Sequence, residues 1–329
     1  MKDSIGWTAG RGAAHRAVLD HLLALVAGSP LGDALVLRGS MTMAAWVGAD
    51  AREPADLDWI VPAPLLVPID PGHPYPYVED LAVVQQWPEA ADGAGRYEIW
   101  RFEEFDTRGL RPAVPPEGLH WIPEAEPEEC APHETLLDLV RERPEAAPGV
   151  VLDADAARED GTWTYTEYDT PGIRVVVPWE ADGLPPGEVR LDFARDERLP
   201  EPAVLTAIPR GDGTGPTVVR SAGRELSLAW KLLWLHADCA TEGRARAKDL
   251  YDAVLLAESP ATRLSPRLLR EVFRREPGNT AATEALRPDA VALWSVDWED
   301  FRTEHPRVRG TAEDWLKRLG RALAPVLGH

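Results

Sequence analysis

Cysteine is scarce in this chain of 329 residues, since Cys130 and Cys239 are the only two. Two cysteines cannot build a disulfide framework, and their spacing is not that of metal ligands, which fits a reducing compartment. Long apolar runs are lacking as well: no segment approaches the roughly 18 apolar residues of a membrane span. The first residues have neither the basic nor the apolar region of a signal peptide. We therefore expect a cytoplasmic protein that has no membrane partner.

Basic charge is also in short supply. Lysine and arginine number 35 against 55 aspartates and glutamates, so the formal net charge is −20. Proteins that coat nucleic acid need clustered positive charge, and this balance argues against that class. Arginines do concentrate in the last third of the chain, where a local basic groove would meet any polyanion. The length and the 44% of hydrophobic residues are sufficient for two folded lobes.

Hydrophobic periodicity divides the chain into a mixed part and a helical part. The pattern predicts a helix over 13–27, a strand over 35–37, a helix over 41–47 and a strand over 57–61. Residues 62–96 are rich in Pro, Gly and Asp and are interpreted as loops or an insertion, with only 81–85 able to hold regular structure. Further strands are expected at 97–102, 162–168, 173–177, 189–194, 204–208 and 217–220, and helices at 228–238, 249–257, 266–274 and 313–327.

The change of period near residue 225 predicts a domain boundary. Residues 1–225 would form a lobe around one mixed or antiparallel sheet, with the insertion at about 62–96, and residues 226–329 would form a helical lobe. The expected fold class is α+β.

A turn and a pair of carboxylates carry the strongest chemical signal. Gly39 and Ser40 follow a strand and precede a helix, where backbone N–H groups and a hydroxyl are well placed for a phosphate. Asp56 and Asp58 lie two residues apart on the next strand and therefore point to the same face. Two carboxylates in one place repel each other unless a cation lies between them, and oxygen ligands suit Mg²⁺. Taken alone, an exposed edge strand and a helix-capping Ser40 explain these residues equally well.

Three later features strengthen the phosphate and metal interpretation. In Val189-Arg190-Leu191-Asp192-Phe193 the alternation places Asp192 on the face opposite the core, as a third carboxylate. Lys231 lies in an apolar helix, so its ammonium has either to snorkel to solvent or to meet an anion such as a phosphate. Asp249 and Asp252 share one helical face. For Asp252 a structural salt bridge to an arginine is an equal alternative.

Other motifs fail on inspection. The segment Gly211-Asp212-Gly213-Thr214-Gly215 lacks the lysine and the helix of a phosphate loop, and a hairpin turn between two strands is the better interpretation. The eight histidines show no zinc-ligand spacing.

These motifs resemble the nucleotidyltransferase toxins of the AbiEii/AbiGii abortive-infection type, in the DNA polymerase beta-like superfamily. The family's Gly-Ser turn, spacer and Asp-x-Asp are similar to Gly39, Ser40, Asp56 and Asp58. Its later Lys followed by Asp-x-x-Asp is similar to Lys231, Asp249 and Asp252, and Arg246-Ala247-Lys248-Asp249-Leu250-Tyr251-Asp252 is the most specific match. The resemblance covers about residues 31–61 and 186–258.

The resemblance implies a nucleotidyltransferase-type sheet lobe that is closed by a helical lobe. It also implies that Asp56, Asp58 and Asp192 hold two Mg²⁺ or Mn²⁺ ions and that Ser40 and Lys231 bind a nucleoside triphosphate. Asp249 and Asp252 would complete the pocket wall. Lys231 is expected to neutralise the leaving pyrophosphate, and its replacement by methionine is expected to leave stability almost unchanged.

The resemblance further implies a toxin whose activity a cognate antitoxin controls, with tRNA or a protein as the nucleotide acceptor. Two alternatives remain open. A small-molecule nucleotidyltransferase of the antibiotic-modifying kind fits the acidic charge better, and a nucleotide-binding scaffold without turnover would not need its carboxylates intact.

Overall fold

The computed structural model describes residues 2–62, 131–160, 172–195, 199–273 and 286–327, together with four strands of two residues each. Its contacts separate residues 63–131 from a larger unit made of residues 1–62 and 132–329. In the smaller unit β3 (Tyr77–Val78) pairs with β6 (Leu119–His120), and β4 (Arg101–Phe102) pairs with β5 (Ala113–Val114), both antiparallel. The candidate site residues all lie in the larger unit.

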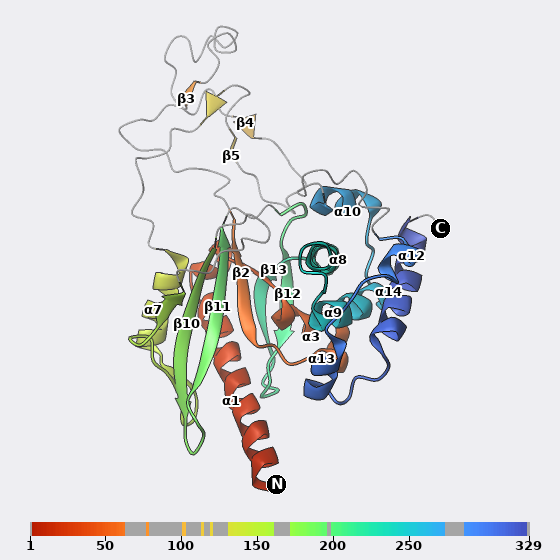
Figure 1. Ribbon diagram of the computed structural model, residues 1–329. Coiled ribbons are helices and arrows are strands. Elements are labelled where there is room, and N and C mark those ends of the chain that lie inside the picture. The colour runs from red at the N-terminus through yellow and green to blue at the C-terminus, as the bar shows by residue number, and fades with distance from the viewer. Residues whose placement is uncertain are drawn as a thin grey trace. The chain divides into compact units, whose positions relative to one another are not determined.

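A mixed sheet of nine strands is the centre of the larger unit (Figure 1). Its strands follow the order β12-β13-β1-β2-β11-β10-β8-β7, and β9 pairs with β10 beside β8. The bounds are β1 (Val36–Arg38), β2 (Asp56–Val61), β7 (Glu145–Ala147), β8 (Val150–Leu152), β9 (Arg158–Asp160), β10 (Gly172–Ala181), β11 (Gly187–Arg195), β12 (Val204–Pro209) and β13 (Pro216–Ser221). The pairs β1–β13 and β2–β11 are parallel and the other pairs are antiparallel.

One face of the sheet is covered by α1 (Lys2–Ala27) and α7 (Pro132–Glu142). Val18 and Leu22 of α1 belong to the same buried cluster as Leu57 and Trp59 of β2 and Phe193 of β11. Because side chains alternate along a strand, burying Leu57 and Trp59 on this face turns the aspartates between and before them to the other face. The packing of α1 therefore fixes the direction of the candidate carboxylates.

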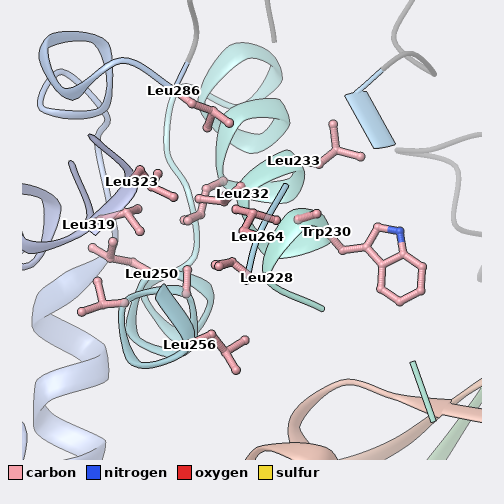
Figure 2. Packing of buried hydrophobic residues seen from close by; sticks show 14 of the residues in the cluster. Leu228, Trp230, Leu232, Leu233, Leu250, Leu256, Leu264, Leu286, Leu319 and Leu323 are labelled. Atoms are coloured by element: carbon pink, nitrogen blue, oxygen red, sulfur yellow. The ribbon is translucent and has the colours of Figure 1, made fainter. Parts of the chain in front are cut away.

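The C-terminal helices form a second buried cluster, which reaches the opposite face of the sheet through Val36 of β1 and Ile60 of β2. These helices are α8 (Arg224–Thr241), α9 (Ala247–Glu258), α10 (Pro266–Phe273), α12 (Pro288–Val291), α13 (Trp298–Glu304) and α14 (Ala312–Leu327). Figure 2 shows Leu228 and Leu232 of α8 gathered with leucines of α9 and α14, while Trp230 points away from them. Each such leucine contributes roughly 1.5–3 kcal/mol when fully buried.

The architecture confirms the α+β class and a mixed sheet. It corrects the expectation that one sheet uses every strand, because Arg101–Phe102, from the strand expected over 97–102, belongs to the separate β4–β5 pair. The expected strands at 35–37, 57–61, 173–177, 189–194, 204–208 and 217–220 and the helices at 228–238, 249–257, 266–274 and 313–327 correspond to β1, β2, β10, β11, β12, β13, α8, α9, α10 and α14. The helix expected over 13–27 is longer and begins at Lys2. Residues 81–85, 97–100 and 162–168 lie outside the described residues.

The helix expected over 41–47 needs correction. A 3-10 turn at Ser40–Thr42 comes first, and only Met43–Val47 is α-helical, as α3. The dipole of so short a helix adds little to the binding of a phosphate. Helix α7 and strands β7, β8 and β9 were not expected from the pattern.

Candidate nucleotide and metal site

The turn after β1 is built around a glycine that no other residue can replace without strain. Gly39 has φ 79° and ψ −156°, a conformation that L side chains rarely adopt. A Cβ atom at this position would lie 2.1 Å from Oδ2 of Asp58, so the backbone of the turn touches that carboxylate directly. Gly39 and Asp58, which the sequence analysis singled out separately, thus lie side by side.

Ser40 lies beside the other carboxylate of the pair. Its side chain is buried, and its hydroxyl donates to Oδ1 of Asp56 over 3.4 Å. The hydroxyl of Thr42 donates to the carbonyl of Gly39 over 2.8 Å and holds the turn. No side-chain hydrogen bond caps the 3-10 turn or α3. Ser40 therefore contacts the acidic pair and does not serve as a helix cap.

Four charged residues form a row across four neighbouring strands. In the strand register Arg38 of β1 lies opposite Asp58 of β2, Asp58 lies beside Asp192 of β11, and Asp192 lies opposite Arg174 of β10. Asp56 precedes Asp58 by two residues and shares its face. The three predicted carboxylates are therefore on one face of the sheet, flanked by an arginine on each side.

Arg174 engages both oxygens of Asp192. Its Nε and Nη2 each lie 2.7 Å from a carboxylate oxygen, and Asp192 is only 3% exposed. Such a bidentate pair fixes the carboxylate firmly. The sequence analysis did not single out Arg174, although the alternation of β10 places it on the same face as Arg190 and Asp192 on the neighbouring strand.

The pKa of Asp58 reflects its burial and the repulsion between the two neighbouring carboxylates. Burial, reinforced by the charge of Asp56, raises the pKa of Asp58 to about 7 from its usual 3.8. The guanidinium of Arg38 opposes this rise but does not cancel it. The side chain of Arg38 is buried and its guanidinium lies 5.8 Å from the ring centres of both Trp230 and Trp234 of α8.

The donor chemistry of the pair suits a divalent cation. Within the described parts of the chain, no three Asp, Glu, His or Cys side chains are grouped so that they could hold a metal ion by themselves. Mg²⁺ at phosphoryl-transfer sites is commonly held by one or two carboxylates together with oxygens of the substrate. Asp56 and Asp58 meet that requirement, since they are two half-buried carboxylates whose repulsion a cation would relieve.

Lys231 is part of a different charged cluster. Its Nζ lies 2.9 Å from Oδ1 of Asp249 and 2.8 Å from Oδ2 of Asp252, and the side chain is buried. Burial alone would lower the pKa of Lys231, but the attraction of Asp252 and Asp249 outweighs it and the pKa is raised. The same attraction overcomes burial at Asp249, where the pKa falls to about 2.

This environment shows which anions Lys231 meets. Its ammonium does not snorkel to solvent, because two carboxylates of its own chain hold it, and the expected contact with a triphosphate stays a prediction. Arg52 completes the cluster: its Nη2 and Nε lie 3.1 Å and 3.3 Å from Oδ2 of Asp252, which is fully buried. The salt bridge to an arginine that was the alternative interpretation of Asp252 is present. Its partner Arg52 could not be predicted, because it is 200 residues away in the sequence.

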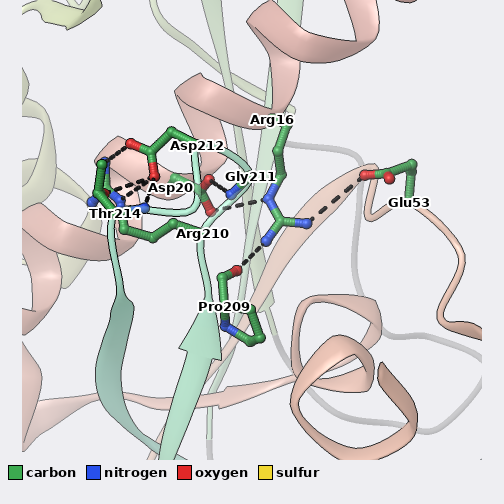
Figure 3. Close-up of polar contacts among 8 residues, drawn as sticks. All are labelled: Arg16, Asp20, Glu53, Pro209, Arg210, Gly211, Asp212 and Thr214. Carbon is green, nitrogen blue, oxygen red and sulfur yellow. Dashed lines mark hydrogen bonds and ion pairs between the residues drawn. The ribbon is translucent and has the colours of Figure 1, made fainter. Parts of the chain in front are cut away.

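The glycine-rich segment is the hairpin turn that the sequence indicated. It joins β12 to β13, whose ends pair at Pro209 and Pro216. The turn is tied to α1, since Oδ2 of Asp20 accepts the N–H of Gly211 at 2.7 Å and Arg16 donates to both Asp20 and the carbonyl of Pro209 (Figure 3). The backbone amide of Gly211 is therefore occupied by a carboxylate of the same chain.

Comparison with known families gives a family match. A family model described as the AbiEii nucleotidyl transferase toxin of type IV toxin-antitoxin systems matches residues 129–319, which is more than half of the chain. The chain belongs to the AbiEii toxin family. No curated protein matches it. The AbiEii match includes Asp192, Lys231, Asp249 and Asp252, whereas the Gly39–Ser40 turn and the pair Asp56 and Asp58 precede the matched residues.

The AbiEii family is one of nucleotidyl transferases that work with an antitoxin. The resemblance to AbiEii toxins that the motifs indicated is therefore confirmed for the family. Among the residues that the structure describes, no helix is long and apolar enough to cross a membrane.

Proposed function

We propose that this AbiEii protein transfers a nucleotide from a nucleoside triphosphate to an acceptor, with tRNA the first candidate and a protein the second, in a reaction that requires Mg²⁺ or Mn²⁺. The observation that carries the proposal is the placement of Asp56 and Asp58 against the Gly39–Ser40 turn and in the same row as Asp192. An acidic cluster beside a tight turn is the arrangement that a metal-bound triphosphate needs.

The proposed reaction displaces pyrophosphate. An acceptor hydroxyl oxygen bonds to the α-phosphorus, the bond from that phosphorus to the bridging oxygen breaks, and the hydroxyl proton passes to water. A divalent ion bound by Asp56 and Asp58 would offset the charge that develops on the attacking and leaving oxygens. The chain's own part is to hold those two carboxylates on a rigid strand while the Gly39 turn keeps the phosphates close.

The remaining residues have supporting roles in this proposal. Asp192 would orient the nucleotide or the ion from the neighbouring strand, fixed by Arg174. The Lys231, Asp249 and Asp252 cluster would form the wall of the pocket, and a contact between Lys231 and the triphosphate would have to share an ammonium that two carboxylates already bind. A cognate antitoxin, expected for the family, would keep the activity in check.

A transfer assay tests the function. The full chain is incubated with Mg²⁺, bulk tRNA and each of the four ribonucleoside triphosphates labelled at the α-phosphate. We expect label in tRNA with at least one triphosphate, and a loss of about a hundredfold or more in Asp58→Asn because several kcal/mol of charge stabilisation disappear. The exposed Lys317→Met variant serves as the control.

Three results would contradict the proposal in different ways. Label that enters hydroxylated small molecules and not tRNA would favour the antibiotic-modifying alternative, for which the net charge of −20 speaks. Binding of triphosphate without any transfer would favour a scaffold. Full activity of Asp58→Asn would remove the carboxylate pair from the mechanism.

A further inference from the structure

The cluster around Lys231 has no net charge. Two cations, Lys231 and Arg52, meet two carboxylates, Asp249 and Asp252, over distances between 2.8 and 3.1 Å at their shortest. All the carboxylate charge in the cluster is thus balanced inside the fold. Moving the ammonium to a phosphate would leave buried carboxylate unpaired, which is costly. A different cation has to meet the terminal phosphates if a triphosphate binds beside Asp56 and Asp58.

Lys248 is placed differently from Lys231. It is the second residue of α9 and its side chain is only partly exposed. No hydrogen bond or ion pair joins its side chain to the described residues, although Asp249 follows it directly and Asp252 is one turn away. Both of those carboxylates are held by Lys231 and Arg52. Lys248 therefore lies beside two acids whose ion pairs are formed with other cations, although its charge still helps to lower the pKa of Asp249.

The contacts of α9 direct its first turn toward the candidate site. The hydroxyl of Tyr251 donates to the carbonyl of Asp50 over 2.7 Å, and Arg52 binds Asp252, so α9 is fastened to the segment that leads directly into β2. The charge of Lys248 acts on Asp58 of that strand as well as on Asp249. The fastening thus brings the positive charge of Lys248 within electrostatic reach of the acidic pair.

We propose that Lys248 binds the β- and γ-phosphates of the nucleoside triphosphate, and that Lys231 is a positioning residue that holds α9 so that Lys248 faces them. This inference rests on the proposed function, because it names the residue that recognises the triphosphate at that same site. A compact ammonium on a flexible stem is suited to a phosphate group whose position changes as pyrophosphate leaves. Its charge is available because the neighbouring acids are already neutralised.

Calorimetry on three proteins tests the assignment. The wild-type chain, Lys248→Met and the control Lys317→Met are titrated, with Mg²⁺ present, with the four ribonucleoside triphosphates and then with the diphosphate and monophosphate of the tightest binder. Methionine keeps most of the apolar stem and removes the charge. We expect Lys248→Met to bind the triphosphate about tenfold or more weakly and the monophosphate equally well, since one charge-assisted contact disappears. Lys317→Met, whose lysine forms a surface ion pair with Glu313, should match the wild type.

Two measurements keep the outcome decisive. The urea midpoint of Lys248→Met should equal that of the wild type, because no ion pair is lost, and Lys248→Arg should recover part of the triphosphate affinity. Equal triphosphate affinity in Lys248→Met and the wild type would overturn the inference, as would an equal loss for the triphosphate and the monophosphate. If the wild-type chain binds no triphosphate, the proposed function fails, and this inference fails with it.

Discussion

Two charged clusters lie within the same folded unit and differ in their balance. The helical cluster pairs Lys231 and Arg52 with two aspartates, all of them mostly or wholly buried. In the sheet cluster Arg174 is paired with Asp192, but the charge of Arg38 does not offset the effects of burial and of Asp56 on Asp58. The pKa of about 2 at Asp249 and about 7 at Asp58 reports this difference, because one carboxylate gains from its surroundings and the other loses.

The difference separates a structural site from a functional one. Buried ions that are fully paired hold elements in a fixed arrangement, and removal of one partner is costly. A carboxylate pair that is left with excess charge destabilises the fold by itself and gains from an added cation. Selection maintains such a cost where the group serves a function. We therefore propose that the sheet cluster carries the chemistry and that the helical cluster positions α9.

The largest expected effect is the loss of the helical cluster. Lys231→Met leaves Asp249 buried without its cation and should lower the free energy of unfolding by about 3–5 kcal/mol. This reverses the expectation from sequence that stability would hardly change. Urea unfolding monitored by circular dichroism gives the value, with the surface variant Lys317→Met as control. A midpoint within error of the wild type would show that the cluster is not the structural site described.

A somewhat smaller effect is expected where the turn meets Asp58. Gly39→Ala should cost about 2–4 kcal/mol, since it adds a strained positive φ to a clash with the carboxylate. Gly48 provides a matched control: its φ is 62°, but a Cβ there meets nothing within 4 Å. Gly48→Ala should therefore show the backbone cost alone, about 1 kcal/mol. If both variants lost the same free energy of unfolding, Asp58 would not be in close contact with the turn at Gly39.

Most of the sheet cluster could be predicted from the sequence because strand alternation is a local rule. Leu57, Leu191 and Phe193 mark the core face, so Asp58 and Asp192 had to share the other face if β2 and β11 belonged to one sheet. That the two strands are neighbours in exact register was beyond reach, since pairing between distant segments depends on tertiary packing. The family motifs named the residues without giving their partners.

The partners of Lys231 could not be read from local pattern. Arg52 is 200 residues away from Asp252, and nothing in its surroundings in the chain marks it as buried. Helix α7, in contrast, had a signal that was missed: Pro132 begins it, and the buried residues His133, Leu136 and Val140 follow helical spacing. The helix has 11 residues, many of them polar, so few residues carry its hydrophobic period. Loop-forming residues also precede it over a long stretch of the sequence.

The Asp58→Asn variant gives the smallest change in stability, in the opposite direction. Because the pKa of Asp58 is raised, the contribution of this one group to stability is fully present below about pH 4. That contribution is lost as the pH rises through about 7, where the folded protein has to ionise the carboxyl group. Asparagine removes that loss. We expect Asp58→Asn to match the wild type near pH 4 and to be more stable by about 1–3 kcal/mol at pH 8 with divalent ions chelated.

The most direct test of the account is thermal unfolding of the wild type and Asp58→Asn side by side at pH 8, each alone, with Mg²⁺, with a nucleoside triphosphate, and with both. The account predicts that Asp58→Asn melts at the higher temperature when nothing is bound. It also predicts that Mg²⁺ and triphosphate together raise the wild-type melting temperature by more than the sum of their separate effects, and that this joint effect disappears in the variant. A joint effect of equal size in both proteins would contradict the assignment of the sheet cluster as the functional site.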